Sequence, residues 1–118
     1  MKTALVIDDN IAVAETLEIF LDLCNITSVI FTDSYKSIED YKKNSHKYDV
    51  VCLDYYMPHI NGLDLFHIFY KINSNIKAFI HTGGDIPTIE KNIKGLYGFI
   101  IKPYNVDNLK QMLKKMEE

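Results

Sequence analysis

The feature that most constrains this chain is a regular order of two kinds of segment along its whole length. Short apolar runs rich in β-branched residues alternate with longer segments whose apolar residues recur every three or four positions. The first kind is typical of strands and the second of amphipathic helices. Most of the runs are continuously apolar, which indicates strands buried on both faces; they comprise residues 4–7, 28–31, 50–53, 78–80 and 99–101.

Helical spacing fills the segments between and after these runs. The stronger predicted helices cover residues 13–24, 65–72 and 106–116, and the weaker ones cover 34–43 and 87–94. Asp33 or Ser34 and Asp85 are candidate N-caps of the weaker pair. Strands that alternate strictly with helices imply parallel pairing, because each parallel connection needs a crossover. We therefore predict an α/β fold of the (βα)5 type, a five-stranded parallel sheet doubly wound with helices on both faces.

Composition limits the function classes that fit. The 118 residues make one domain, residues 1–118, with room for a single core. The net charge of −3 argues against direct nucleic-acid binding, which needs a basic face. Cys24 and Cys52 lie in apolar segments without metal-type spacing and are predicted to be buried thiols of a reducing compartment. The N-terminal apolar run is too short for a signal peptide or a membrane span, so we expect a cytoplasmic protein without membrane contact.

Polar residues of particular kinds follow four of the five predicted strands. Asp8 and Asp9 end the first, Asp54 the third, Thr82 the fourth and Lys102 the fifth. Because parallel strands bring their carboxyl ends to one edge, these side chains are expected to form one pocket. Crowded carboxylates raise one another's pKa unless a cation neutralises them. Mg²⁺ fits, since it prefers oxygen ligands and often shares its shell with a phosphate.

Each of these residues also has an ordinary structural explanation. Asp8 and Asp9 are suited to cap the helix that begins near residue 11. Asp54 is suited to a turn before Met57-Pro58, Thr82 to a plain strand end, and Lys102 to a solvated surface position. All four explanations holding together at four strand ends would be a large coincidence.

Four motifs, taken in order, resemble those of the receiver domains of bacterial response regulators over essentially the whole chain. Any one of them alone is weak, whereas the full set at these spacings is specific. The motifs are Leu5-Val6-Ile7-Asp8-Asp9, Cys52-Leu53-Asp54-Tyr55-Tyr56-Met57-Pro58, Ile80-His81-Thr82-Gly83 and Phe99-Ile100-Ile101-Lys102-Pro103. The resemblance implies a flavodoxin-like receiver fold and a role in two-component phosphorelay signalling.

If the resemblance holds, Asp54 is the phosphoacceptor. It would take a phosphoryl group from a phosphohistidine of a sensor histidine kinase or a phosphotransfer protein, in a Mg²⁺-dependent reaction. The family pattern implies that Asp9 and Asp54 bind Mg²⁺ directly, that Asp8 binds mainly through water, and that the backbone carbonyl of Tyr56 completes the protein ligands. Such a domain is a switch rather than an enzyme, because it catalyses only its own phosphorylation and dephosphorylation.

The resemblance also implies how the phosphoryl group is held and sensed. Lys102 and Thr82 would hold its oxygens, and the Lys102–Pro103 peptide bond is expected to be cis. Movement of Thr82 would let an aromatic residue of the fifth strand, here Phe99, turn inward. Many members have tyrosine at that position, so in this chain packing alone would stabilise the inward state.

The expected output surface is built from the fourth helix, the fifth strand and the fifth helix. It would include Lys91, Lys94, Tyr97, Phe99 and Tyr104. Because no further module is encoded, the signal would pass to a downstream protein target, or to an effector domain that follows Glu118 and is missing from this sequence.

Rival functions remain open on the residues alone. A nucleotide or flavin binder is disfavoured because the first loop, Asp8-Asp9-Asn10, would repel phosphate. A small aspartyl-phosphate phosphatase is closer, although it would be expected to show two aspartates separated by one residue. A pure interaction domain would have a degenerate pocket. The histidines share no metal or triad spacing, so surface or packing roles are expected for them; they are His46, His59, His67 and His81.

Two further positions bear on how long an acyl phosphate would survive. Tyr56 lies two residues after the expected phosphoacceptor, and Gly84 lies two residues after Thr82. We expect the bulky Tyr56 to shield one side of the phosphoryl group from water and Gly84 to leave the other side open.

Overall fold

The computed structural model describes residues 2–85, 92–103 and 105–117, and it contains one five-stranded parallel sheet in the order β2-β1-β3-β4-β5. The strands are β1 (Lys2–Ile7), β2 (Ile26–Phe31), β3 (Val50–Asp54), β4 (Ala78–Thr82) and β5 (Leu96–Ile101). The helices are α1 (Ile11–Leu23), α2 (Ser34–Asn44), the 3₁₀ turn η1 (Ser45–Lys47), α3 (Gly62–Ile72) and α4 (Val106–Glu117).

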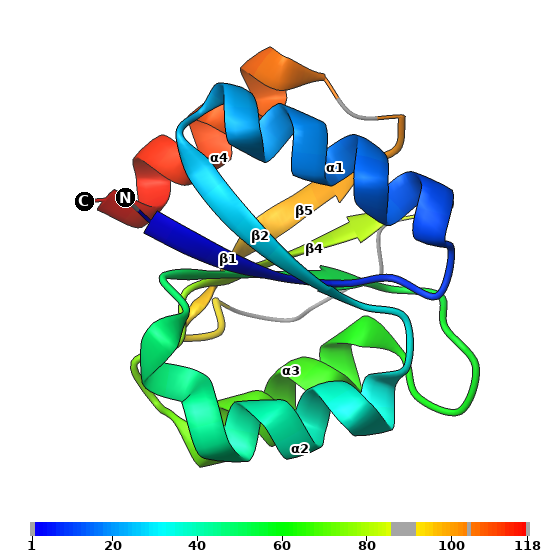
Figure 1. Cartoon of the computed structure of the whole chain (residues 1–118), viewed down its shortest axis with the longest axis vertical. Coiled ribbons are helices and arrows are strands. Elements are labelled where there is room, and N and C mark those ends of the chain that lie inside the picture. Colours follow the sequence, from blue (N-terminus) through cyan, green and yellow to red (C-terminus); the bar gives the residue numbers. More distant parts are fainter. Residues whose placement is uncertain (1, 86–91, 104, 118) are drawn as a thin grey trace.

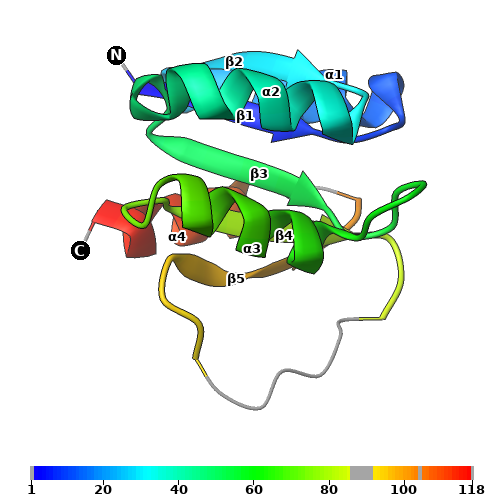
Figure 2. The ribbon, with the colours of Figure 1, turned by 90° about the horizontal axis from the view of Figure 1, so that it is seen from below.

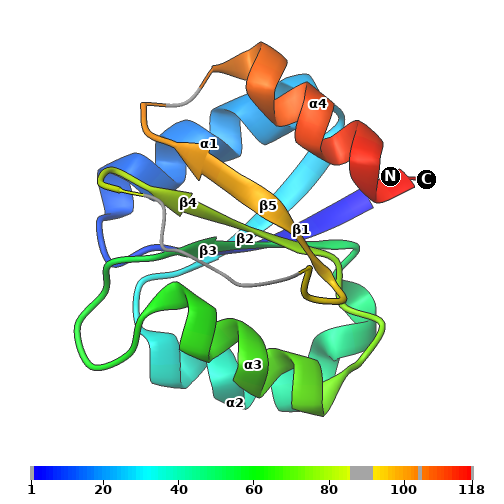
Figure 3. The same ribbon diagram turned by 180° about the vertical axis from the view of Figure 1, so that it is seen from behind.

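Helices cover both faces of the sheet, as the strand–helix order predicts. Helices α1 and α4 lie on one face, and α2 and α3 lie on the other (Figure 1). The view from below shows α2 and α3 in front of the strands (Figure 2), and the reverse view shows β5 at the edge below α4 (Figure 3). The α/β doubly wound fold is thereby confirmed. Within the described part of the chain, every helix is too short or too polar to cross a membrane.

Each strand sends alternate side chains into two separate apolar cores. Val6 and Cys52 pack with the buried face of α1 and α4, whereas Leu5 and Leu53 pack with that of α2 and α3. Strands β3 and β4 lie in the middle of the order and are buried throughout. The alternation sets which polar residues share a side where the strands end.

The strand ends and caps differ in places from the sequence prediction. Strands β2 and β5 begin earlier than expected, at Ile26 and Leu96, because pairing with β1 and β4 continues across Thr27 and Gly98, which break the apolar pattern. Helix α1 is capped by Asn10, so the capping explanation for the two preceding aspartates is wrong.

Three further sequence predictions concern a helix cap, the two cysteines and the segment before β5. Asp33 caps α2, and its carboxylate accepts from two backbone N–H groups. Cys24 and Cys52 are free thiols, half-buried and buried respectively. The helix expected over 87–94 with Asp85 as its cap, and the surface residues Lys91 and Tyr104, lie wholly or largely outside the described residues.

Gly62, the first residue of α3, lies directly against the end of β3. A Cβ atom at this position would lie 2.5 Å from the carbonyl oxygen of Asp54, well inside van der Waals contact. The Gly62 N–H also donates to the carbonyl oxygen of Tyr55 at 2.9 Å. Helix α3 therefore fixes the backbone at Asp54, and only a residue without a side chain fits there.

We expect Gly62→Ala to destabilise the fold by about 1–3 kcal/mol, because the new methyl group must displace the Asp54 backbone. Urea unfolding would measure this. Gly83→Ala is a matched control, since its Cβ would lie 3.9 Å from the Lys102 side chain, an ordinary contact, and we expect a change within about 0.5 kcal/mol. Equal stability of Gly62→Ala and the wild type would contradict the close approach.

Candidate functional site

Four polar side chains meet at the carboxyl edge of the sheet on its α1/α4 side. Each lies two positions after a residue of the core beneath α1 and α4, so strand alternation carries it to the same face. The pairs of core residue and polar residue are Val6 and Asp8, Cys52 and Asp54, Phe79 and His81, and Ile100 and Lys102. The sheet geometry thus gathers two carboxylates, an imidazole and an ammonium.

Asp8 is fully buried and both its carboxylate oxygens are hydrogen-bonded. Oδ1 accepts from the Asn10 backbone N–H at 2.9 Å. Oδ2 lies 3.0 Å from Nζ of Lys102 and 3.1 Å from Nε2 of His81. The carboxylate is therefore held in one orientation from three directions.

Lys102 bridges the two buried aspartates. Its Nζ donates to Oδ2 of Asp8 and to Oδ1 of Asp54, both at 3.0 Å, and its side chain is 19% exposed. The explanation of Lys102 as a solvated surface residue is therefore wrong. The peptide bond from Lys102 to Pro103 is cis, as the resemblance implies.

The pKa values of the two buried aspartates shift in opposite directions. Burial raises the pKa of Asp54, the bond to Lys102 lowers it, and the charge of Asp8 raises it again, giving about 7 instead of 3.8. For Asp8 burial also acts upward, but hydrogen bonds from His81, Asn10 and Lys102 outweigh it and lower the pKa to about 2. One lysine charge does not neutralise two buried carboxylates, so the edge is electrostatically suited to a further cation.

His81 is the site residue that the sequence analysis missed. It is fully buried, and one of its ring nitrogens forms a group with carboxylate oxygens of Asp8 and Asp54 in which all three atoms lie within 4.8 Å of one another. A surface or packing role was expected for His81, and its contact with the Asp8 carboxylate shows that this expectation is wrong. The pairing of strands β3 and β4 would have indicated this contact, since His81 lies opposite Asp54 in their register.

Three further predicted residues lie at or after the ends of β1, β4 and β3. Asp9 is exposed beside Asp8, and its carboxyl adds to the upward shift in the pKa of Asp54. Thr82 is buried at the end of β4, and its Oγ1 accepts from the Gly84 N–H at 3.1 Å. Tyr56 follows β3 and is 57% exposed.

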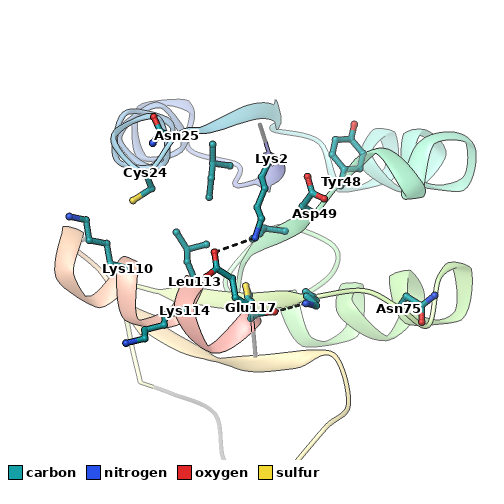
Figure 4. Close-up of a pocket in the computed structure, with 14 residues that line it drawn as sticks. Lys2, Cys24, Asn25, Tyr48, Asp49, Asn75, Lys110, Leu113, Lys114 and Glu117 are labelled. Atoms are coloured by element: carbon teal, nitrogen blue, oxygen red, sulfur yellow. Dashed lines mark hydrogen bonds and ion pairs between the residues drawn. The ribbon is translucent and has the colours of Figure 1, made fainter.

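A separate cavity of about 750 Å³ lies at the opposite, amino edge of the sheet, close to both ends of the chain (Figure 4). Two interactions join the strands to the last helix across it. Lys2 pairs with Glu117 at 3.3 Å, and the Lys77 ammonium donates to the Met116 carbonyl oxygen. Because these contacts join β1 and the segment before β4 to the end of α4, we assign them a structural role.

The pKa of Asp54 predicts how stability depends on pH. A carboxyl with a raised pKa binds its proton more tightly when folded, so this group lowers stability as pH rises from about 4 through about 7. Without divalent cations, we expect Asp54→Asn to be more stable than the wild type by roughly 1–3 kcal/mol at pH 8 and equal to it near pH 4.

Urea unfolding in chelator at several pH values would measure the difference. Asp22→Asn, an exposed site at the far end of α1, is the control and should track the wild type at every pH. An Asp54→Asn protein less stable than the wild type at pH 8 would show that Lys102 more than compensates the buried charge.

Comparison with known proteins gives this site its context. The family model for the response regulator receiver domain matches residues 4–114. The chain is 29% identical over 114 residues to the C4-dicarboxylate transport transcriptional regulatory protein DctD of Rhizobium meliloti, covering 95% of this chain and 24% of DctD. It is 30% identical over 89 residues to the chemotaxis protein CheY of Thermotoga maritima, covering 74% and 72%. The chain thus spans about a quarter of the length of DctD.

Solved structures agree with the sequence relatives. The response regulator TrrA of Thermotoga maritima, in complex with Mg²⁺ and BeF, superposes with a TM-score of 0.82 at 25% identity, over 98% of this chain and 99% of TrrA. TrrA in complex with the histidine kinase ThkA gives 0.81 at 25% identity, over 100% of both chains. Since the family model spans nearly all of the sequence, this chain belongs to the response regulator receiver domains, the signalling switches of two-component systems.

Proposed function

We propose that residues 1–118 form one receiver domain that accepts a phosphoryl group on Asp54 from a phosphohistidine of a sensor histidine kinase or a phosphotransfer protein. The observation that carries the proposal is the Asp54 carboxylate, 3% exposed, at the end of β3 with the Lys102 ammonium 3.0 Å away and Asp8 beside it. The similarity to TrrA, which has been solved both with Mg²⁺ and BeF and with a histidine kinase, supports it.

The donor set at this edge fits Mg²⁺. Carboxylate oxygens are the ligands that this ion prefers, and the raised pKa of Asp54 shows that the pair lacks positive charge. We propose that Asp9 and Asp54 bind the ion directly, that Asp8 binds through water, and that the Tyr56 backbone carbonyl completes the protein ligands. Bound Mg²⁺ would neutralise charge on the phosphoryl oxygens during transfer.

The chain's own residues perform the rest of the transfer by positioning. A carboxylate oxygen of Asp54 attacks phosphorus while the P–N bond breaks, and the donor imidazole leaves with that electron pair. Lys102 offsets charge on the phosphoryl oxygens from its place beside Asp54, and the Thr82 hydroxyl donates to one of them. Water later attacks the acyl phosphate and releases inorganic phosphate, which restores the carboxylate.

Labelling with acetyl phosphate tests the acceptor assignment. We expect Mg²⁺-dependent incorporation of one phosphoryl group into the wild type, no incorporation into Asp54→Ala, and normal incorporation into the exposed control Asp22→Asn. Intact-protein mass spectrometry reads the outcome, and chelator should abolish the label.

Two results would reject the proposal. Labelling that persists in Asp54→Ala would place the acceptor elsewhere. Sustained release of phosphate from a phosphomonoester, with many turnovers per molecule, would favour the aspartyl-phosphate phosphatase instead.

We further propose that phosphorylation is sensed through Thr82 and Phe99. Phe99 is half-buried in the edge strand β5 and pairs with Ile80 of β4, close to Thr82. A hollow of about 310 Å³ lies beside Phe99, between β5 and α4, with the exposed Ile101 on its border. This surface, together with Lys94 and Tyr97, would pass the signal to a protein target or to an effector domain that follows Glu118, without direct nucleic-acid contact by the receiver.

Tyr56 and Gly84, the two positions expected to govern how water reaches the phosphoryl group, lie against each other. A Cβ atom on Gly84 would lie 3.1 Å from Cε2 of Tyr56, so the tyrosine ring occupies the space above Gly84. The expectation that Gly84 leaves this side open is therefore wrong. The ring also packs edge-on against Tyr55, at 4.7 Å between centroids, and we propose that Tyr56 and Gly84 together shield one side of the phosphoryl group.

We expect Tyr56→Ala to shorten the half-life of the acyl phosphate several-fold, because water gains access to Asp54 once the ring is removed. Tyr56→Phe keeps the ring and should retain the wild-type half-life. Gly84→Ala should also shorten it, since the new methyl group displaces the ring. Loss of ³²P label over time measures all three, and unchanged decay in Tyr56→Ala would rule out shielding.

A further inference from the structure

His81 is a buried polar residue whose role the proposed chemistry does not use. It is the fourth residue of β4, it is fully buried, and it pairs in register with Asp54. Phe79, two positions earlier on the same face, lies 6.4 Å away between ring centroids in the core beneath α1 and α4. The imidazole therefore reaches the acidic cluster from a rigid strand in the middle of the sheet.

Its ring contacts the Asp8 carboxylate directly. Nε2 lies 3.1 Å from Oδ2 of Asp8, the same oxygen that Lys102 contacts at 3.0 Å. The other oxygen of Asp8 is held by the Asn10 N–H. Lys102 also donates to Asp54, so it does not serve Asp8 alone. His81 contacts one oxygen of the Asp8 carboxylate, and Asn10 contacts the other.

The charges of these donors differ in a way that matters for a cation site. A divalent ion near Asp8 and Asp54 repels the Lys102 ammonium, which stands on a flexible four-carbon stem. A neutral imidazole N–H is not repelled in this way and keeps its place. An Nε2–H donor exists in both the protonated ring and one neutral tautomer.

We propose that His81 is a positioning residue of the acidic site, whose Nε2–H holds the Asp8 carboxylate in the orientation from which it faces a bound divalent cation. This inference rests on the proposed Mg²⁺-dependent function and adds a residue to it. Hydrogen-bond donors behind a direct metal ligand commonly change metal affinity 10–100-fold when they are removed, and because Asp8 binds through water we expect a smaller effect of about 3–10-fold.

A different role for the same atom would be direct metal ligation. A ring nitrogen of His81 lies within 4.8 Å of carboxylate oxygens of both Asp8 and Asp54. Ligation needs the Nε2 lone pair, however, whereas a hydrogen bond to Oδ2 of Asp8 at 3.1 Å needs a proton on Nε2. The geometry favours the donor role, and a nitrogen ligand would show itself through a selective gain for softer ions.

Three variants of the full chain separate these roles. His81→Gln places an amide donor near the position of Nε2, His81→Asn has the same donor on a shorter stem, and His81→Leu has similar bulk without a donor. Calorimetric titration with Mg²⁺ and with Mn²⁺ gives the dissociation constants, and NMR of the Asn10 amide reports the orientation of Asp8. Thermal unfolding without metal gives stability separately.

We expect His81→Leu and His81→Asn to weaken binding of both ions about 3–10-fold by a similar factor, and His81→Gln to stay within about twofold of the wild type. The Asn10 amide shift should move with the loss of affinity. If the leucine variant does not fold, the comparison of His81→Gln with His81→Asn tests the positioning role, because these two variants differ only in how far the amide donor reaches toward Asp8.

Wild-type affinity for Mg²⁺ in both His81→Leu and His81→Asn would overturn the positioning role while leaving the proposed phosphoacceptor intact. Loss of Mn²⁺ binding that far exceeds the loss of Mg²⁺ binding in all variants, glutamine included, would overturn it in favour of direct ligation. A wild type that binds no Mg²⁺ would refute the proposed function itself, and the inference with it.

Discussion

The arrangement at the functional edge depends on two buried carboxylates of like charge and one ammonium between them. Asp8 and Asp54 present oxygens within 4.8 Å, and Lys102 contacts both at 3.0 Å. Charges in such a site are poorly screened, so a net negative charge there is unfavourable. The pKa of Asp54 rises to about 7 whereas that of Asp8 falls to about 2, so the unfavourable negative charge is felt mainly at Asp54.

The sheet sets this arrangement through strand order and alternation. With β1, β3 and β4 adjacent, Asp8 and Asp54 follow neighbouring strands, and His81 pairs directly with Asp54. Two apolar cores hold those strands from both sides, and Gly62 lets α3 pack directly on the Asp54 backbone. The unfavourable charge is thus fixed by packing elsewhere in the molecule, as is common at functional sites.

Apolar pattern and strand-end residues were enough to predict the doubly wound fold and the gathering of Asp8, Asp54 and Lys102, because both follow from periodicity and parallel direction. What escaped prediction depends on register and on contacts in three dimensions. The role of His81 required knowing that it lies opposite Asp54, and the packing of Tyr56 on Gly84 joins two loops distant in sequence. Element ends at Ile26 and Leu96 depended on pairing partners instead of local composition.

The same charge imbalance links the cation to the phosphoryl group in the proposed function. A phosphoryl group on Asp54 would replace the single negative charge of the carboxylate by nearly two, at an edge that already lacks positive charge. A cation that relieves the Asp8–Asp54 repulsion must therefore bind more tightly once the phosphoryl group is present, and by linkage the phosphorylated state is favoured by the cation to the same degree. Residues that hold Asp8 in place, such as His81, act on both equilibria, because a carboxylate free to turn away from the ion would weaken this coupling.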